Sequence, residues 1–130
     1  MQTFLPYADF RTSLDCLDNR RLGKQRVEAM QLVRAIETNS AWSRHPAARM
    51  WKNFVPALKL YHDIAIRVWL ERGFKNSMVE YNEEVSDFPM WLGKENFHSA
   101  HRSNLLRKDP IHYGKFGWKE LPNLPYVWPE

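Results

Sequence analysis

The chain has 130 residues and a mass of 15.6 kDa, which suits one domain with one hydrophobic core. Apolar residues make up 44% and charged residues 26%, a composition that excludes a disordered or collagen-like chain. The 19 lysines and arginines exceed the 15 acidic residues, for a net charge of +4. No apolar run is long enough to span a bilayer, and the first residues lack the pattern of a secretory signal, so we expect neither a membrane protein nor a secreted one.

Cysteine usage and the distribution of charge narrow the class further. Cys16 is the single cysteine, which excludes an internal disulfide, and we expect a cytoplasmic protein with an inert, buried thiol at this position. Residues 20–26 hold four cations and no acid, whereas acidic residues gather in 80–87. This asymmetry favours a polyanionic partner such as DNA, although solvated helix faces would give the same pattern.

Two long helices are predicted in the first half of the chain. The first is capped by Asp9 or Thr12 and runs to about Glu37. The second begins at Pro46, a residue favoured in the first turn of a helix, and ends at Gly73. Apolar residues recur along it at steps of three and four, which predicts a buried stripe.

The second half of the chain carries weaker patterns. A short acidic helix is predicted over 77–85 and an apolar connector over 88–92, and a helix capped by Asn96 or Ser99 ends before Asp109 and Pro110. The segment 111–130 combines glycines and prolines with aromatic rings, which is typical of an irregular tail laid over helices. We therefore predict an all-α fold, a compact three- to four-helix single domain over residues 1–130 with an ordered aromatic, Pro-rich C-terminal tail.

The middle of the first helix is polar where its buried stripe should continue. Asp18, Arg21, Gln25 and Glu28 are three, four and three residues apart and share one side of a helix. They either neutralise one another as an ion-pair network or line a concave site. We favour the site, because burying so many polar groups for structure alone is costly. Gly23 in the same turn indicates the close approach of a ligand or of another helix.

A second polar cluster precedes and opens the second helix. His45 stands before Pro46, with Arg49 and Lys52 in the following turns, and cations near aromatic rings suit a nucleic-acid groove. His98 and His101 are three residues apart, but without neighbouring cysteines or acids we expect phosphate or surface contacts rather than a metal. Neither a metal nor a cofactor is expected.

Four motifs carry a resemblance to a known family. They are, in chain order, Leu17-Asp18-x-Arg20-Arg21-Leu22-Gly23-Lys24-Gln25-Arg26-Val27-Glu28, His45-Pro46-x-x-Arg49-Met50-Trp51, Tyr61 with Arg72-Gly73-Phe74, and Leu105-Leu106-Arg107-Lys108-Asp109-Pro110-x-x-Tyr113. Together they resemble a small bacterial and phage family that is distantly similar to pyrimidine-dimer DNA glycosylases of the phage endonuclease V type.

The resemblance implies an all-α enzyme that extrudes a nucleotide from the duplex and attacks C1′. In those glycosylases an N-terminal α-amine forms a Schiff base, and a glutamate on the first long helix stabilises positive charge. The bulky Gln2 should leave Met1 in place here, so the amine would come from Met1 or Lys24. The expected glutamate position falls near 20–22, and the carboxylate role passes to Asp18 or, preferably, Glu28.

The resemblance and the charge pattern together predict a monomeric DNA N-glycosylase for a damaged or modified pyrimidine, with or without AP-lyase activity. The alternatives are a non-catalytic nucleic-acid-binding module on the same scaffold and an enzyme acting on a small molecule or nucleotide. The residues expected to contact DNA are Arg20, Arg21, Gln25, Arg26, His45, Arg49, Lys52, His101, Arg102, Arg107, Lys108 and Tyr113.

Overall fold

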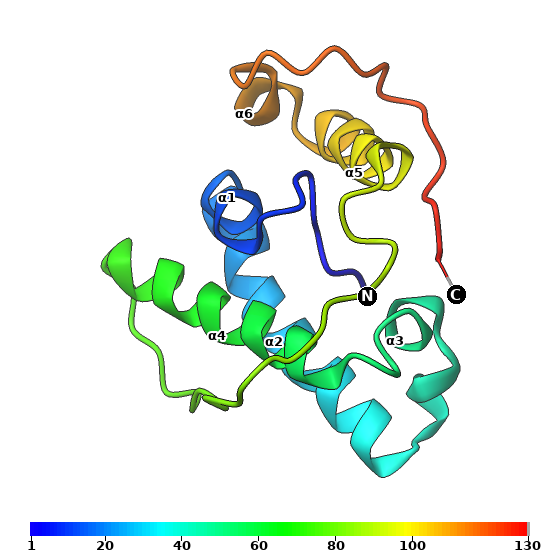
Figure 1. The fold of residues 1–130 in the computed structure, drawn as a ribbon. Helices are drawn as coiled ribbons and strands as arrows, with labels where there is room; N and C mark the ends of the chain where they lie inside the picture. The colour runs from blue at the N-terminus through cyan, green and yellow to red at the C-terminus, as the bar shows by residue number, and fades with distance from the viewer. Residues whose placement is uncertain (130) are drawn as a thin grey trace.

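A computed structural model of the chain describes residues 1–129, and every regular element in this range is helical (Figure 1). The prediction of an all-α fold is confirmed. The elements are α1 (Phe10–Asp15), α2 (Asn19–Thr38), the 3-10 helix η1 (Ala41–Arg44), α3 (Pro46–Arg49), α4 (Val55–Glu71), α5 (Glu95–Lys108) and α6 (Pro110–Gly114).

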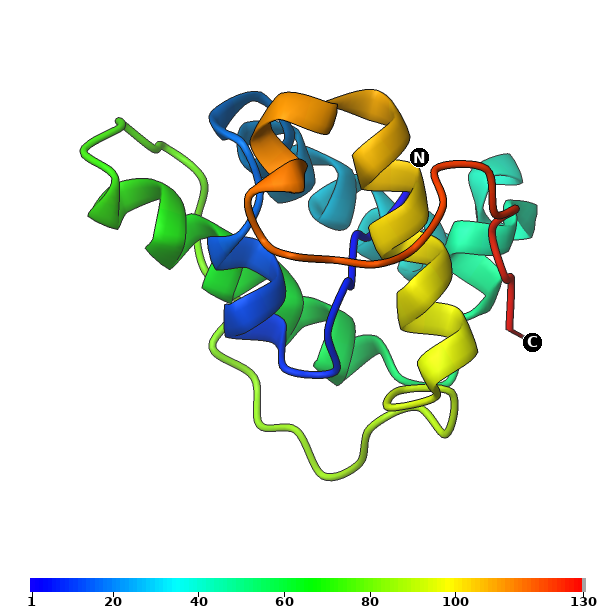
Figure 2. The ribbon, with the colours of Figure 1, turned by 90° about the horizontal axis from the view of Figure 1, so that it is seen from above.

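The helices form two groups with the start of the chain between them. Helices α2 and α4 pack against each other, and α1 packs on α4. Helices α5 and α6 form the second group, and the N-terminal segment (residues 2–7) runs between the two groups in both views (Figures 1 and 2). Beyond α6 the chain follows α5 and ends near α3 (Figure 1). Within residues 1–129, no helix is long and apolar enough to cross a membrane.

The predicted first helix is divided into α1 and α2. Asp9 caps α1 by accepting a hydrogen bond from the Thr12 backbone N–H, as one of the two predicted caps. Asp18 has an extended backbone, with φ −63° and ψ 158°, and its side chain accepts from the Arg21 N–H as the N-cap of α2. The helix therefore ends and restarts at Asp18, although the apolar periodicity of the sequence continues across the break.

The predicted second helix is also divided. The short α3 ends at Arg49, a turn follows, and α4 begins at Val55 with Pro56 in its first turn, where the missing N–H costs nothing. The apolar stripe nevertheless stays buried on both sides of the break, and Gly73, at φ 89°, follows the end of α4 as predicted.

Residues 77–85 are irregular, so the predicted acidic helix is wrong. Asp63 of α4 is buried, and its carboxylate accepts hydrogen bonds from the backbone N–H groups of Tyr81 and Asn82 at 2.9 Å each. These bonds hold the segment against α4 in a conformation that is not helical. The connector 88–92 is irregular with a turn, as predicted.

The last predicted helix and the tail differ from the prediction only at their ends. Helix α5 ends at Lys108 as expected, but it starts at Glu95, before either predicted cap. Asp109 then caps α6 by accepting from the His112 N–H, so part of the predicted irregular tail is helical. Beyond α6 the tail is irregular and its aromatic rings pack on the core, as predicted.

The backbone of the N-terminal segment is held by side chains from both helix groups. Trp51 donates to Thr3 Oγ1, and Tyr61 of α4 donates to the Phe4 carbonyl at 2.8 Å. From α5, His101 Nδ1 accepts from the Leu5 N–H, and His98 Nδ1 contacts the Leu5 carbonyl. Buried peptide groups without a neighbouring strand need such partners. The segment is therefore fixed in the interior and delivers Met1 to a defined place.

Candidate active site at the start of the chain

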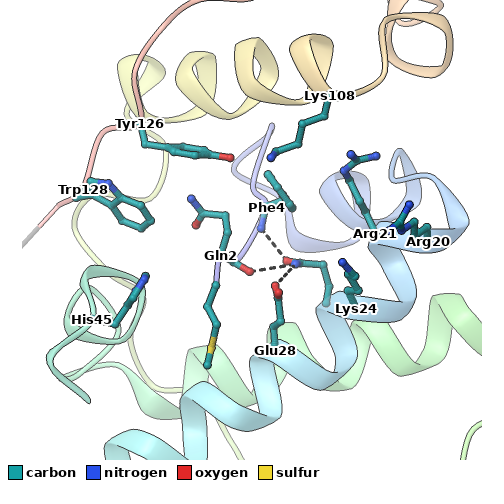
Figure 3. Close-up of a pocket in the computed structure, with 12 residues that line it drawn as sticks. Gln2, Phe4, Arg20, Arg21, Lys24, Glu28, His45, Lys108, Tyr126 and Trp128 are labelled. Atoms are coloured by element: carbon teal, nitrogen blue, oxygen red, sulfur yellow. Dashed lines mark hydrogen bonds between the residues drawn. The ribbon is translucent and has the colours of Figure 1, made fainter. Parts of the chain in front are cut away.

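A pocket of about 430 Å³ opens where the N-terminal segment meets α2 (Figure 3). It is lined by side chains from α2, α5, the His45 turn and both ends of the described chain: Met1, Gln2, Phe4, Arg20, Arg21, Lys24, Gln25, Glu28, His45, Lys108, Tyr126 and Trp128. The predicted polar side of the first helix therefore faces a cavity, and the start of the chain forms part of the same wall.

Cations occupy one side of the pocket and aromatic rings the other. In Figure 3, Arg20, Arg21 and Lys24 lie across the cavity from Tyr126, Trp128 and His45. Because Glu28 is the one acidic lining residue within 1–129, against four lysines and arginines, the cavity suits an anionic ligand. The sequence indicated Tyr126 and Trp128 only as anchors of the tail, since an irregular segment has no periodicity that shows where its rings lie.

Glu28 is the carboxylate of this pocket. Its side chain is half-buried, and Oε2 accepts a hydrogen bond from Gln25 Nε2 at 3.0 Å. Among residues 1–129, no cation forms an ion pair with Glu28. The Glu28 carboxylate is therefore held in place and is available to a positive charge in the pocket.

Asp18 has a different role. It caps α2, forms an ion pair with Arg21 at 3.1 Å and accepts a short hydrogen bond from the Tyr113 hydroxyl. Burial would raise the pKa of Asp18, but the bonds from Tyr113 and Arg21 outweigh it and hold that pKa below its usual value. Since Asp18 is not a lining residue of the pocket, the structure separates the two candidate carboxylates and leaves Glu28 in the cavity.

Three amines reach the pocket, those of Met1, Lys24 and Lys108. The pKa of Lys108 is lowered by burial and by the nearby charges of Arg21, Arg107 and Lys24, and Glu28 opposes this shift. A lowered pKa gives an amine a larger neutral, nucleophilic fraction. The sequence offered Lys108 only as a phosphate contact, because two of the like charges around it, those of Arg21 and Lys24, come from another helix.

His45 forms the wall next to the N-terminal amine. Its Nδ1 accepts from the Ala47 N–H at 3.0 Å, which leaves the hydrogen of the neutral ring on Nε2. Burial and the charge of the N-terminal amine lower the pKa of His45, so the neutral ring is favoured. His45 can therefore donate from Nε2 to a ligand in the pocket.

Several residues expected to contact DNA lie elsewhere. Arg26 is on another side of α2, where its guanidinium stacks 4.4 Å from the Trp69 ring centroid and donates to Asn76. His101 is 1% exposed, and Arg102 is 9% exposed and bonded to Glu95, Glu120 and the Pro6 carbonyl. These three side chains support the packing of the fold and do not line the pocket, and their contacts with DNA stay predictions.

The remaining predicted contacts do not line the pocket. Arg49 and Lys52 line a separate cavity of about 570 Å³, together with residues of α2 and η1. Arg107 is exposed and donates to Asn104, whereas Tyr113 is buried. Among residues 1–129, no three His, Cys, Asp or Glu side chains come together as a set that could hold a metal.

Cys16 and Gly23 are packed against other parts of the protein and do not line the pocket. Cys16 is 6% exposed, and burial raises the pKa of its thiol to about 12, which fits the predicted inert thiol. A Cβ at Gly23 would lie 3.0 Å from the Trp69 ring, so the close approach at this glycine is made by α4 and not by a ligand.

The arrangement of the pocket supports one kind of chemistry. An amine can attack an electron-poor carbon, Glu28 can stabilise the positive charge that develops, and the cations can hold phosphates.

Comparisons with known proteins agree with this arrangement at the level of family. No match was found among curated proteins or among solved structures. The family model described as pyrimidine dimer DNA glycosylase matches residues 1–82, which is more than half of the chain. The chain therefore belongs to the pyrimidine dimer DNA glycosylase family.

Proposed function

We propose that the protein is a DNA N-glycosylase that removes a damaged pyrimidine, with the pyrimidine dimer as the first substrate to test. The observation that carries the proposal is the pocket that combines Glu28, three amines and a cationic wall. A DNA strand supplies both the anion and the electrophilic C1′ that such a pocket fits. The protein would act on DNA in the cytoplasm, as a monomer.

The proposed reaction begins when a neutral amine attacks C1′ of the damaged nucleotide. The N–C1′ bond forms as the glycosidic bond breaks, and the bond pair leaves with the base, which takes up a proton. Positive charge develops on the sugar in the transition state, where the Glu28 carboxylate stabilises it. Opening of the sugar ring then moves electrons to O4′ and gives a protonated Schiff base.

Strand cleavage would follow from that Schiff base. Loss of a proton from C2′ supplies the electron pair that forms the C2′–C3′ double bond and expels the 3′ phosphate. The amine would come from Met1 or Lys24, and Lys108 is the third amine in reach. If the amine does not react, water attacks C1′ and the protein is a glycosylase without lyase activity.

The pocket walls would bind the nucleotide. Arg20, Arg21 and Lys24 would hold phosphates on the cationic side. The rings of Tyr126 and Trp128 would offer flat faces to an extruded base, which is easier to extrude when damage has weakened its stacking and pairing.

Base release from a panel of duplexes tests the proposal. The panel contains an undamaged duplex, a pyrimidine-dimer duplex, and duplexes with oxidised or modified pyrimidines. We expect free base, an abasic site that alkali cleaves, or a direct strand break in at least one damaged duplex, and none of these in the undamaged control. Binding to all duplexes with a steep salt dependence and no release from any would contradict the proposal and favour the non-catalytic DNA-binding module.

A further inference from the structure

The Gln25 side chain sits at the junction of the N-terminal segment, α4 and the pocket carboxylate. Gln25 is 1% exposed, although it is one of the residues that line the pocket. Its Oε1 accepts from the Phe4 N–H at 2.8 Å and lies 2.7 Å from the Tyr61 hydroxyl, whose single hydrogen it shares with the Phe4 carbonyl. Its Nε2 donates to the Gln2 carbonyl and to Glu28 Oε2, at 3.0 Å each.

These four bonds use the whole capacity of the amide. A side-chain amide has two donors and an oxygen with two lone pairs, and each has a protein partner here. Gln25 therefore has no free donor or acceptor in this arrangement, and its contact with DNA stays a prediction. Its role must be sought in what the four bonds connect.

The bonds connect the carboxylate to the start of the chain. Two of them hold residues 2 and 4 of the N-terminal segment, and a third fixes one oxygen of Glu28 (Figure 3). Met1, directly before the first held residue, lines the same pocket as Glu28. One rigid amide thus sets the position of Met1 relative to the carboxylate.

We propose that Gln25 is the positioning residue of the site, which holds the N-terminal segment and the Glu28 carboxylate in one fixed arrangement. This inference rests on the proposed function. Only an amide meets all four demands: a carboxylate could not donate to Gln2 and Glu28, and an ammonium could not accept from Phe4 and Tyr61. A carboxylate at position 25 would also lie within contact distance of Glu28 and repel it.

Two variants of Gln25 and one comparison variant test the proposal. Gln25→Met keeps the size of the side chain and removes all four bonds, and Gln25→Glu adds a second carboxylate. Tyr61→Phe is the comparison variant, because it removes the hydroxyl from both the amide and the Phe4 carbonyl but leaves the bonds of Gln25 to the Phe4 N–H, Gln2 and Glu28. All three are confirmed as folded by thermal unfolding before kcat, KM and the pH–rate profile of base release are measured.

We expect Gln25→Met to lower kcat about 10- to 100-fold with KM for the duplex little changed, since misplaced groups slow chemistry more than binding. Tyr61→Phe should lower thermal stability and keep kcat within about threefold of the wild type. Gln25→Glu should move the acidic limb of the profile to higher pH, because two adjacent carboxylates retain a proton more readily than one. A wild-type kcat and profile in Gln25→Met, or an equal loss of kcat in Tyr61→Phe, would overturn the proposal.

A measurement without activity separates this inference from the proposed function. Amide hydrogen exchange at Phe4 should be at least about tenfold faster in Gln25→Met than in Tyr61→Phe, because only the first variant removes the acceptor of that N–H. If the wild type releases no base from any duplex, the proposed function fails, and exchange at Phe4 still decides whether Gln25 holds the segment. Equal exchange in the two variants would show that it does not.

Discussion

Two helices carry polar residues on their inner side, and the structure uses them in opposite ways. On α2, the side of Lys24 and Glu28 opens on a pocket with room for a ligand. On α5, His98, His101 and Arg102 are buried and bonded to the backbone of Leu5 and Pro6. Both helices carried candidate residues in the sequence, α2 because polar side chains continue its buried stripe, and α5 because of its cations and the spacing of His98 and His101.

The difference comes from the N-terminal segment that lies between these helices. A segment without a neighbouring strand must find partners for its peptide groups, and here side chains provide them. The polar residues of α5 meet that need, whereas Glu28 and the cations of α2 lie beyond the end of the segment. Polar residues on the inner side of a helix can thus indicate a buried irregular segment as well as a site.

The largest expected effect is that of Glu28→Gln on the pocket side of α2. The change keeps the shape of the side chain and removes the charge, so base release should fall by about 10²- to 10³-fold with little change in stability. Glu37→Gln, on the same helix but paired with Lys59, is the matched control and should release base at the wild-type rate. If Glu28→Gln released base at the wild-type rate, Glu28 would not be a catalytic carboxylate, and the contrast between α2 and α5 would fail.

The next effect concerns pH and the buried side of α5. Burial lowers the pKa of His101 to about 3, well below the value of about 6.5 in an unfolded chain. The folded state therefore disfavours the protonated ring. The contribution of the neutral His101 ring to the free energy of unfolding is fully present above pH 6.5. It is lost as the pH falls toward 3, by up to a few kcal/mol.

Urea unfolding at pH 7 and pH 5 measures this loss, in a range where exposed carboxylates stay ionised. The variant His101→Gln has no ring to protonate, and its stability should change less between the two pH values than that of the wild type. An identical pH dependence in the two proteins would mean that His101 is not the buried base described here.

A pair of cation variants separates the two helices directly. Lys24→Ala should weaken duplex binding severalfold and reduce the salt slope by about 1, with stability unchanged, because Lys24 is exposed at the pocket. Arg102→Ala should cost about 3 kcal/mol of stability, since it leaves the Pro6 carbonyl without its donor and the half-buried Glu120 without its cation, and should keep the salt slope. Binding isotherms at several salt concentrations, together with unfolding curves, measure both effects. A reduced salt slope in Arg102→Ala and a lower stability in Lys24→Ala would contradict the account.

The smallest effect concerns the side of α2 that packs on α4. Gly23→Ala gains helix propensity but places a Cβ 3.0 Å from a Trp69 ring that is already held by Arg26 and Phe74. We expect a net destabilisation of about 1 kcal/mol. Gly114→Ala, where nothing lies within 4 Å of the added Cβ, is the control and should be neutral or stabilising. A stabilised Gly23→Ala would show that the Trp69 ring can move.

Sequence patterns found the helix class and the polar side of α2, because both follow from residue spacing alone. They missed the break at Asp18, since the apolar steps from Leu14 to Leu22 continue across it. They also missed the break before α4, because the apolar stripe continues across Val55 and Pro56. Contacts between distant segments, such as Lys108 and Trp128 in the pocket, depend on the tertiary fold and leave no local signal.

The most direct test of the pocket as the reaction site uses a duplex with a preformed abasic site. Its aldehyde forms a Schiff base with any amine held near C1′, borohydride reduction makes the link permanent, and peptide mapping identifies the modified residue. Our account predicts an adduct on Met1, Lys24 or Lys108, the three amines of the pocket. An adduct on a lysine outside the pocket, such as Lys75 or Lys119, would contradict it.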